Sequence, residues 1–218
     1  MSETLLPCAW AVGGYLVGGI PFGYLIGRAR GVDVRTVGSR NIGATNVFRT
    51  VGKSWGVLAL ACDIAKGLLP TLAARHFAGG PAWLPLATGV ACVVGHTLTP
   101  YMKFKGGKGV ATSFGMLIAL LPGLVGAAFL LFAAVFSLSN YISLGSCSAA
   151  VFLAVAVWFP VLGCDGLANP AQCVLVTLMA LFVVVKHSAN IGRLARGVEN
   201  KTYLFGKKPA EAGGKETK

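Results

Sequence analysis

The chain has 218 residues, of which 55% are hydrophobic and 12% are charged, and its mean hydropathy of +0.72 excludes an ordinary soluble domain. This composition predicts a single all-α bundle that crosses a membrane several times. The formal net charge of +12 could indicate a nucleic-acid partner. The basic residues, however, lie between the apolar runs, as they do on the cytoplasmic face of a membrane protein, so we expect no nucleic acid to bind.

The apolar runs predict seven membrane-spanning segments in one domain, residues 1–206. The first run extends from about Leu5 to Ile26, with a kink expected at Pro21. The run from Val110 to Leu138 is too long for one crossing, so we expect two short helices that turn at Pro122. The remaining spans are expected at about residues 54–74, 83–99, 144–162 and 171–185, with a turn at 163–170. A count of five remains an alternative, and the polar tail 207–218 is predicted to be disordered.

The distribution of Lys and Arg predicts the orientation in the membrane. Of the 19 basic residues, six lie in 28–53, three in 101–108 and eight after Val185. Arg75 alone is left for the other side, and Lys66 lies within a span. Because cytoplasmic loops carry the excess of Lys and Arg, the N-terminus is expected outside, with the C-terminus and the polar segments in the cytoplasm.

Two ionisable residues lie inside the second predicted span. Asp63 and Lys66 are three residues apart, which places them on one face of a helix. Charged groups at this depth are rare and usually pair with one another inside the bundle. A structural ion pair and a catalytic pair are both open from the sequence.

The first polar segment runs from Gly38 to Lys53. Ser39 and Asn41 stand at the expected start of a short surface helix, where unpaired N–H groups can hold an anion. Asn41, Thr45 and Arg49 recur at every fourth position, which would align an amide, a hydroxyl and a guanidinium on one helical face. These groups bind phosphate. A capped amphipathic surface helix is the alternative.

The second polar segment, Lys105 to Gly109, combines two cations with three glycines. Such glycines let main-chain N–H groups approach an anion closely. The segment is not a Walker A loop, because Gly109 stands where Ser or Thr should follow Lys108. Since a short helix is expected to start at Val110, the segment is a candidate anion site. A flexible basic loop at the lipid head groups is the alternative.

The third polar segment runs from His187 to Glu199. His187 and Asn190 are three residues apart at the end of the last span, so on a helix both could face one site. No His in the chain is followed five positions later by Asp, and there is neither a G-x-S-x-G sequence nor a metal-ligand cluster. We therefore expect no metal and no cofactor.

Several motifs together resemble the bacterial acyl-phosphate:glycerol-3-phosphate acyltransferases, the PlsY family. The matching stretches, in family order from residue 38 to 199, are GSRNIGATNVFR, DIAKG, GHTLTP, FKGGKGVAT, YISLGS and HSANIGRLARGVE. The resemblance implies a multi-pass inner-membrane enzyme without a cofactor, whose partners are its two substrates and membrane lipid. That enzyme would move a fatty acyl group from acyl phosphate to the 1-hydroxyl of glycerol 3-phosphate. The products would be lysophosphatidic acid and phosphate, in the first step of phospholipid synthesis.

The motifs and the resemblance together indicate which residues form the site. Catalytic roles are expected for Ser39, Arg49, Lys108, His187 and Asn190. Substrate binding is expected for Asn41, Thr45, Asn46, Lys105, Gly106, Gly107, Gly109, Ser143, Ser146 and Glu199, with structural support as a second role for Glu199. The chain departs from the family pattern at Arg40, where Gly is usual, at Leu98-Thr99-Pro100, where Phe-Pro is common, and at Asn140, where a basic residue is frequent.

We expect the cationic side chains to position the phosphates of both substrates and to offset the charge that develops on the acyl carbonyl. The group that removes the proton from the glycerol hydroxyl is open between His187 and the phosphate of glycerol 3-phosphate.

Two other functions are possible for a polytopic basic protein, but they fit this sequence less well than the acyltransferase function does. A transporter of phosphate esters would place its polar groups near the membrane midplane, and a protein that only binds anionic lipids would not need so many Asn, Thr, Ser and Gly residues.

Overall fold

The computed structural model describes residues 5–159 and 170–203, and within these ranges it contains helices and loops but no strands. The all-α class is therefore confirmed. The elements, in chain order, are α1 (Leu5–Gly19), α2 (Phe22–Ala29), α3 (Ala44–Thr50), α4 (Lys53–Phe77), α5 (Leu84–Thr97), the 3-10 turn η1 (Pro100–Met102), α6 (Val110–Leu120), α7 (Pro122–Ser139), α8 (Ile142–Ala156), α9 (Pro170–Lys186) and α10 (Ser188–Ala195).

Three helical segments are long and apolar enough to cross a membrane: Leu5–Ala29, Lys53–Phe77 and Pro122–Ser139. A fourth is formed if α9 and α10, which are bent by 52° at His187, count as one span. Helices α6 and α8 are apolar but shorter. A multi-pass membrane bundle agrees with these lengths, and the count of seven spans stays a prediction.

Two predicted interruptions are confirmed. The first apolar run breaks between α1 and α2 at Ile20 and Pro21, and the run from Val110 to Leu138 breaks at Leu121, directly before Pro122. Proline causes both breaks because its ring removes a backbone donor and clashes with the preceding turn of a helix. The predicted end of the sixth span at residue 162, most of the turn at 163–170 and the tail 207–218 lie outside the described residues.

The short helix of the first polar segment begins later than expected. Helix α3 starts at Ala44, and Asn41 lies in the loop before it. The Oδ1 atom of Asn41 accepts a hydrogen bond of 2.8 Å from the Gly43 N–H, a local turn that competes with helix formation. The predicted alignment of Asn41, Thr45 and Arg49 on one helical face is therefore wrong.

Glycines let the backbones of the bundle approach closely. A Cβ atom added to Gly18 on α1 or to Gly95 on α5 would overlap the main chain of the other helix. Helices α4 and α6 meet in the same way, because a Cβ on Gly67 would overlap the Thr112 carbonyl oxygen and one on Gly115 would overlap that of Ile64. Small residues serve this purpose in membrane helix pairs.

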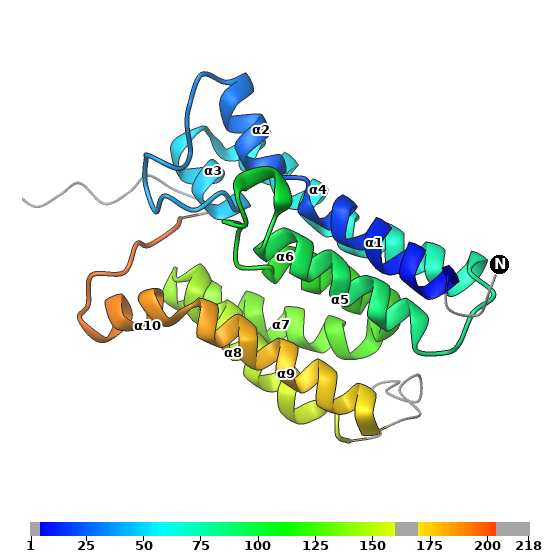
Figure 1. Cartoon of the computed structure of the whole chain (residues 1–218). Coiled ribbons are helices and arrows are strands. Elements are labelled where there is room, and N and C mark those ends of the chain that lie inside the picture. Colours follow the sequence, from blue (N-terminus) through cyan, green and yellow to red (C-terminus); the bar gives the residue numbers. More distant parts are fainter. Residues whose placement is uncertain (1–4, 160–169, 204–218) are drawn as a thin grey trace, which may run out of the picture.

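The crossing of α4 and α6 sets the depth of the second polar segment. Helix α6 begins at Val110 beside the middle of α4, roughly 20 Å along that helix from Lys53 at about 1.5 Å per residue. Figure 1 shows α2, α3 and α10 at one end of the bundle and the start of α1 at the opposite end. The chain from η1 to α6 therefore runs from the polar end into the bundle.

Candidate active site

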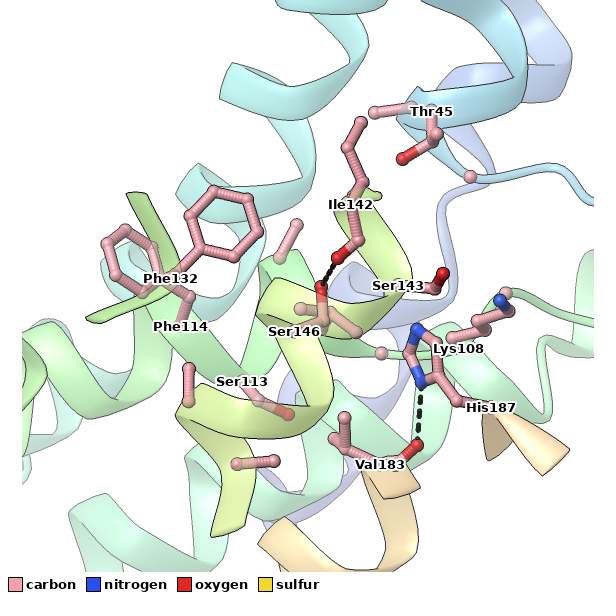
Figure 2. A pocket seen from close by; sticks show the side chains of 18 of the residues that line it. Thr45, Lys108, Ser113, Phe114, Phe132, Ile142, Ser143, Ser146, Val183 and His187 are labelled. Atoms are coloured by element: carbon pink, nitrogen blue, oxygen red, sulfur yellow. Dashed lines mark hydrogen bonds between the residues drawn. The ribbon is translucent and has the colours of Figure 1, made fainter. Parts of the chain in front are cut away.

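The three polar segments line one cavity of about 770 Å³. At one end its walls come from residues of the first segment, the glycine-rich loop 105–109 and the start of α10. Its other part extends between α6, α7, α8 and α9 and is lined by apolar side chains such as Phe114 and Phe132. Figure 2 shows Lys108 and His187 next to each other, with both aromatic rings on the far side of the cavity. The space is thus polar at one end and apolar along the rest.

Lys108 and Asn190 join the second and third polar segments. The Lys108 Nζ atom donates a hydrogen bond to Asn190 Oδ1, and Asn190 Nδ2 donates to Glu199 Oε1 at 2.5 Å. The amide therefore links a cation on one side to a carboxylate on the other. Only a side chain with both an acceptor and a donor can do this, which explains why Asn suits position 190.

Glu199 is a buried anchor for the third segment. Its carboxylate accepts hydrogen bonds from Ser143 Oγ at 3.0 Å and from Arg193 Nε at 2.6 Å, in addition to the Asn190 amide. Burial raises the pKa of Glu199, but the hydrogen bonds from Asn190, Arg193 and Ser143 outweigh it and hold the pKa below its ordinary value. The carboxylate is thus ionised at neutral pH, and its contacts are those of a structural support.

His187 occupies the bend between α9 and α10. Its Nδ1 atom lies 2.8 Å from the Val183 carbonyl oxygen, which can only accept, so Nδ1 carries the proton and Nε2 has the lone pair. Burial and the nearby charge of Lys108 lower the pKa of His187 to about 4, although the Val183 hydrogen bond and Glu199 act in the opposite direction. The ring is therefore neutral at pH 7, with Nε2 able to accept a hydrogen bond.

The glycine-rich loop is anchored on the end of α5. The Gly106 N–H donates to the Thr97 carbonyl and the Gly107 N–H donates to the His96 carbonyl, both at 3.1 Å. A Cβ on Gly106 would overlap the His96 carbonyl oxygen, so only glycine permits this approach. Gly109, at a φ of +80°, turns the chain into α6. The loop thus brings Lys108 beside the first turn of that helix.

Burial changes the acid–base properties of Lys108. It lowers the pKa of the ammonium group, Glu199 raises it, and the charges of Arg193 and Arg49 lower it further, to about 8. Lys108 is therefore mostly charged at pH 7 but loses its proton more readily than a surface lysine. Its neighbours Arg49 and Arg193 also line the cavity, so this end of the cavity is cationic.

Asn46 shapes the first polar segment. It is 1% exposed, and its amide donates to the carbonyl oxygens of Val34 at 2.8 Å and Val37 at 3.2 Å. Its Oδ1 accepts from the Ser39 N–H at 2.9 Å. All of these bonds hold the loop before α3, so Asn46 positions Ser39 at the rim of the cavity.

Arg49 ties the first segment to the end of the described chain. Its Nε and Nη2 atoms donate to Thr202 Oγ1 at 3.0 and 2.6 Å, and Nη2 also donates to the Asn200 carbonyl at 3.0 Å. These partners are more than 150 positions away in sequence. The guanidinium is thus held at the mouth of the cavity by its own chain.

Most predicted site residues meet in this cavity. Those that line it are Ser39, Asn41, Thr45, Asn46, Arg49, Gly106, Gly107, Lys108, Gly109, Ser143, Ser146, His187, Asn190 and Glu199. Lys105 is exposed and its side chain is not among the lining groups. The hydroxyls of Ser143 and Ser146 are occupied, the first by Glu199 and the second by the Ile142 carbonyl at 2.9 Å.

Several lining residues were not predicted from the sequence, and three of them, Thr202, Arg193 and His96, make informative contacts. Thr202 and Arg193 lie in the cavity wall and hold Arg49 and Glu199, but no local pattern distinguishes them from other polar residues of the C-terminal segment. His96 lies in the GHTLTP stretch, is 5% exposed and borders the glycine-rich loop. Its place inside an apolar run was the available signal. Among the described residues no group of three His, Cys, Asp or Glu side chains could hold a metal ion.

The fold and the cavity define a class: a polytopic helical membrane protein with a cationic pocket that continues into an apolar channel. The model of the family described as glycerol-3-phosphate acyltransferase matches residues 8–197. The chain belongs to this family of integral membrane proteins.

Relatives and solved structures agree with that assignment. Glycerol-3-phosphate acyltransferases of Trichlorobacter lovleyi and Geobacter sulfurreducens are each 42% identical to this chain, over 195 and 187 residues. The alignments cover 88% and 86% of this chain and 95% and 93% of those proteins. A crystal structure of PlsY, an integral membrane glycerol 3-phosphate acyltransferase in its glycerol 3-phosphate form, matches with a TM-score of 0.80 and 34% identity. That match covers 90% of this chain and 96% of the other.

Proposed function

We propose that this protein is a membrane acyltransferase that moves a fatty acyl group from acyl phosphate to the 1-hydroxyl of glycerol 3-phosphate. The products are lysophosphatidic acid and inorganic phosphate, and the reaction is the first step of phospholipid synthesis. One observation carries the proposal: a single cavity joins a cationic end to an apolar channel. Both substrates bear phosphate and one of them bears a long acyl chain, so this shape fits the pair. Matching PlsY structures in glycerol 3-phosphate and lysophosphatidic acid forms support the same substrate and product.

The cationic end is suited to two phosphates. Lys108, Arg49 and Arg193 line it, and Ser39 and Thr45 add hydroxyl groups at the rim. Charged donors in a partly buried site bind phosphate oxygens more strongly than neutral donors do. We assign the acyl phosphate to the end of the glycine-rich loop, where the Lys108 ammonium and the first main-chain N–H groups of α6 lie together, because the Gly106 and Gly107 N–H groups are already bonded to α5. We assign glycerol 3-phosphate to the side of Arg49.

The apolar channel is suited to the acyl chain. Phe114 on α6 and Phe129, Phe132 and Phe136 on α7 form an aromatic wall, in which adjacent ring centroids lie 5.8 to 6.2 Å apart. Met179 on α9 lies on the lining as well. Burial of each methylene contributes about 0.8 kcal/mol. A long chain would therefore bind far more tightly than a short one.

The transfer needs one nucleophilic displacement at the acyl carbon. The oxygen of the glycerol 1-hydroxyl attacks the carbonyl carbon and forms the new C–O ester bond. The bond from that carbon to the phosphate oxygen breaks, and phosphate leaves with the electron pair. Lys108 offsets negative charge on the leaving phosphate, because its ammonium group lies at the cationic end and faces Asn190.

The proton of the hydroxyl must pass to a base. His187 is neutral and presents Nε2, but with a pKa of about 4 it is a weak base at pH 7. The phosphate of glycerol 3-phosphate, with a second pKa of about 6 by analogy with a phosphorylated side chain, is a stronger one. We therefore assign the proton transfer to the substrate phosphate. His187 Nε2 accepts a hydrogen bond from the 2-hydroxyl of glycerol 3-phosphate and so orients the substrate, which leaves the proton of the 1-hydroxyl free to pass to the phosphate.

We also propose an inner-membrane location with the cavity open to the cytoplasm. The positively charged segments at residues 28–53, 101–108 and after Val185 support this orientation, which puts the N-terminus outside. Labelling of single cysteines introduced at Ser2 and Thr217 in intact and permeabilised cells tests it. Labelling of position 217 in intact cells would contradict it.

Purified protein in detergent tests the reaction directly. With palmitoyl phosphate and glycerol 3-phosphate it is expected to release inorganic phosphate and to form 1-acyl lysophosphatidic acid in equal amounts, as measured by a phosphate assay and mass spectrometry. Palmitoyl-CoA in place of palmitoyl phosphate serves as the donor control and should give no product. Folded protein that releases no phosphate, or that uses palmitoyl-CoA equally well, would refute the proposed donor.

A further inference from the structure

Three ionisable residues that take no part in the proposed chemistry lie buried inside the bundle. Asp63 and Lys66 on α4 and His96 on α5 are 2%, 5% and 5% exposed. Charged groups within membrane helices are costly, and they persist where they serve a site or satisfy one another. These three residues are here called the buried triad, and one of them, His96, lies against the glycine-rich loop.

Lys66 anchors the triad to the break between α1 and α2. Its Nζ atom donates a hydrogen bond of 2.8 Å to the Ile20 carbonyl at the break, which also accepts the Phe22 N–H at 3.1 Å. The same atom lies 2.9 Å from Asp63 Oδ1, as an ion pair without hydrogen-bond geometry. The Lys66 ammonium thereby compensates the charge of the Asp63 carboxylate and holds it in position. The Oδ1 atom of Asp63 can still accept a hydrogen bond.

His96 connects this ion pair to the loop. Its Nδ1 atom faces Asp63 Oδ1 at 3.7 Å and, among the described residues, has no hydrogen-bond partner. The opposite edge of the ring, at Nε2, occupies the space where a Cβ of Gly107 would stand. The His96 main chain also accepts the Gly107 N–H at 3.1 Å. One residue therefore holds Gly107 through both its backbone and its side chain.

We propose that the buried triad is a positioning device for the donor phosphate. Lys66 fixes Asp63, Asp63 orients the His96 ring, and the ring supports Gly107, so that the next residue, Lys108, points towards Asn190. The three are positioning residues, because they act through the loop. The proposal rests on the proposed function, in which this loop binds acyl phosphate.

The physical reason lies in the glycines themselves. A loop with three glycines has many accessible backbone conformations and no side chains with which to pack. The Lys108 ammonium and the main-chain N–H groups at the start of α6 stabilise a phosphate only if they already point to one place before it binds. The rigid surface behind the loop must therefore come from other residues. Asp63 and His96 also line the cavity, so the support reaches the site itself.

The variants Asp63→Asn and His96→Gln, alone and together, test the proposal. Each keeps a polar group of similar size but removes the charge or the ring. We expect the KM for palmitoyl phosphate to rise about 10-fold in each single variant, while the KM for glycerol 3-phosphate changes less than about twofold. Because both residues act through one contact, the double variant should be no worse than the more affected single variant.

Thr88→Val is the matched control. Thr88 is fully buried on α5, like His96, but its hydroxyl bonds to the Leu84 carbonyl at 2.9 Å, and it does not line the cavity. This substitution should leave both KM values unchanged. It separates a general effect of losing a buried polar group from an effect on the loop.

The following results would overturn the proposal. Variants that lose the folded state, or that lower kcat with both KM values unchanged, would show that the triad only holds the bundle together. An equal rise in both KM values would show that it does not act on the donor phosphate. Variants with the turnover and the KM values of the wild type would refute the triad assignment alone. A wild-type protein that releases no phosphate would refute the proposed function and this assignment with it.

Discussion

The Lys108 ammonium donates a hydrogen bond to the Asn190 amide oxygen, and this contact joins two segments that are 82 positions apart in sequence. The other end of the same amide donates to Glu199. Asn190 therefore needs both an acceptor and a donor, and it sets the position of the cation. The proposed displacement depends on this arrangement, because Lys108 lies where the leaving phosphate is expected.

Asn190→Asp should reduce kcat/KM by about 100-fold. The substitution keeps the shape but replaces the donor with a carboxylate oxygen next to Glu199, and two like charges at this distance repel. Steady-state kinetics with palmitoyl phosphate would measure the loss. Adding Glu199→Gln restores one donor and one acceptor and should recover part of the activity. A single variant with activity near that of the wild type would contradict the assigned role.

The activity should fall on the alkaline side as Lys108 loses its proton. Lys108 is charged below its pKa of about 8 and neutral above it, so kcat/KM, which reports the free enzyme, should decline above about pH 8. Bound phosphate favours the charged form, so the decline of kcat should occur at higher pH. Lys108→Arg keeps the positive charge, so the alkaline decline of kcat/KM should move to higher pH. An alkaline decline at the same pH in the variant would show that a group other than Lys108 causes it.

His187→Asn should lower kcat while the acid limb of the pH profile stays in place. If the substrate phosphate is the base, activity falls below about pH 6 in both proteins, because that phosphate then becomes protonated. The pKa of His187, at about 4, lies below this range. We expect a loss of about 100-fold in kcat. Disappearance of the limb at pH 6 in the variant would instead make His187 the base.

Thr202→Val should weaken the function of Arg49. The hydroxyl accepts two hydrogen bonds from the guanidinium, at 3.0 and 2.6 Å, and hydrogen bonds to charged groups contribute about 1.5–3 kcal/mol each. We expect kcat/KM to fall at least about 10-fold, mainly through the KM for glycerol 3-phosphate. Thr202→Ser keeps the hydroxyl and should behave like the wild type. Equal activity of both variants would exclude this role.

Arg40→Gly should stabilise the protein with little effect on activity. Arg40 has a φ of +58°, a region in which glycine is favoured, and its side chain is exposed. Removal of the backbone strain should raise the free energy of unfolding by about 1 kcal/mol, which corresponds to a rise of about 2–4 °C in the thermal midpoint in detergent. Arg40→Ala removes the charge but not the strain and serves as the control. A loss of activity in both variants would instead reveal a role for the guanidinium.

The backbone angle bears on the expected glycine at residue 40. A turn with a positive φ favours glycine, so this turn suits the residue that the family resemblance leads one to expect. Arg40 adopts the same angle, with its N–H donating to the Val37 carbonyl at 3.0 Å. The turn thus survives the substitution, and Ser39 and Asn41 on either side both line the cavity.

The sequence by itself determined the membrane bundle, the break at Pro21, the short α6 before Pro122 and the chemical types of the site residues. These features depend on local causes: the length of an apolar run, the ring of a proline, and the donors and acceptors of a side chain. The ion pair of Asp63 and Lys66 was also predictable, because both residues lie on one helical face. The start of α3 was not, because the Asn41 side chain competes with the helix.

Only the tertiary structure decided which groups meet. The bonds from Arg49 to Thr202 and from Lys108 to Asn190 join residues that are 153 and 82 positions apart. Such contacts depend on how closely α4 and α6 approach, which Gly67 and Gly115 allow, and on the bend at His187. The position of His96 behind Gly107 follows from the same packing. Periodicity reports the face of a helix, whereas the partner of that face is set by the fit of all the helices together.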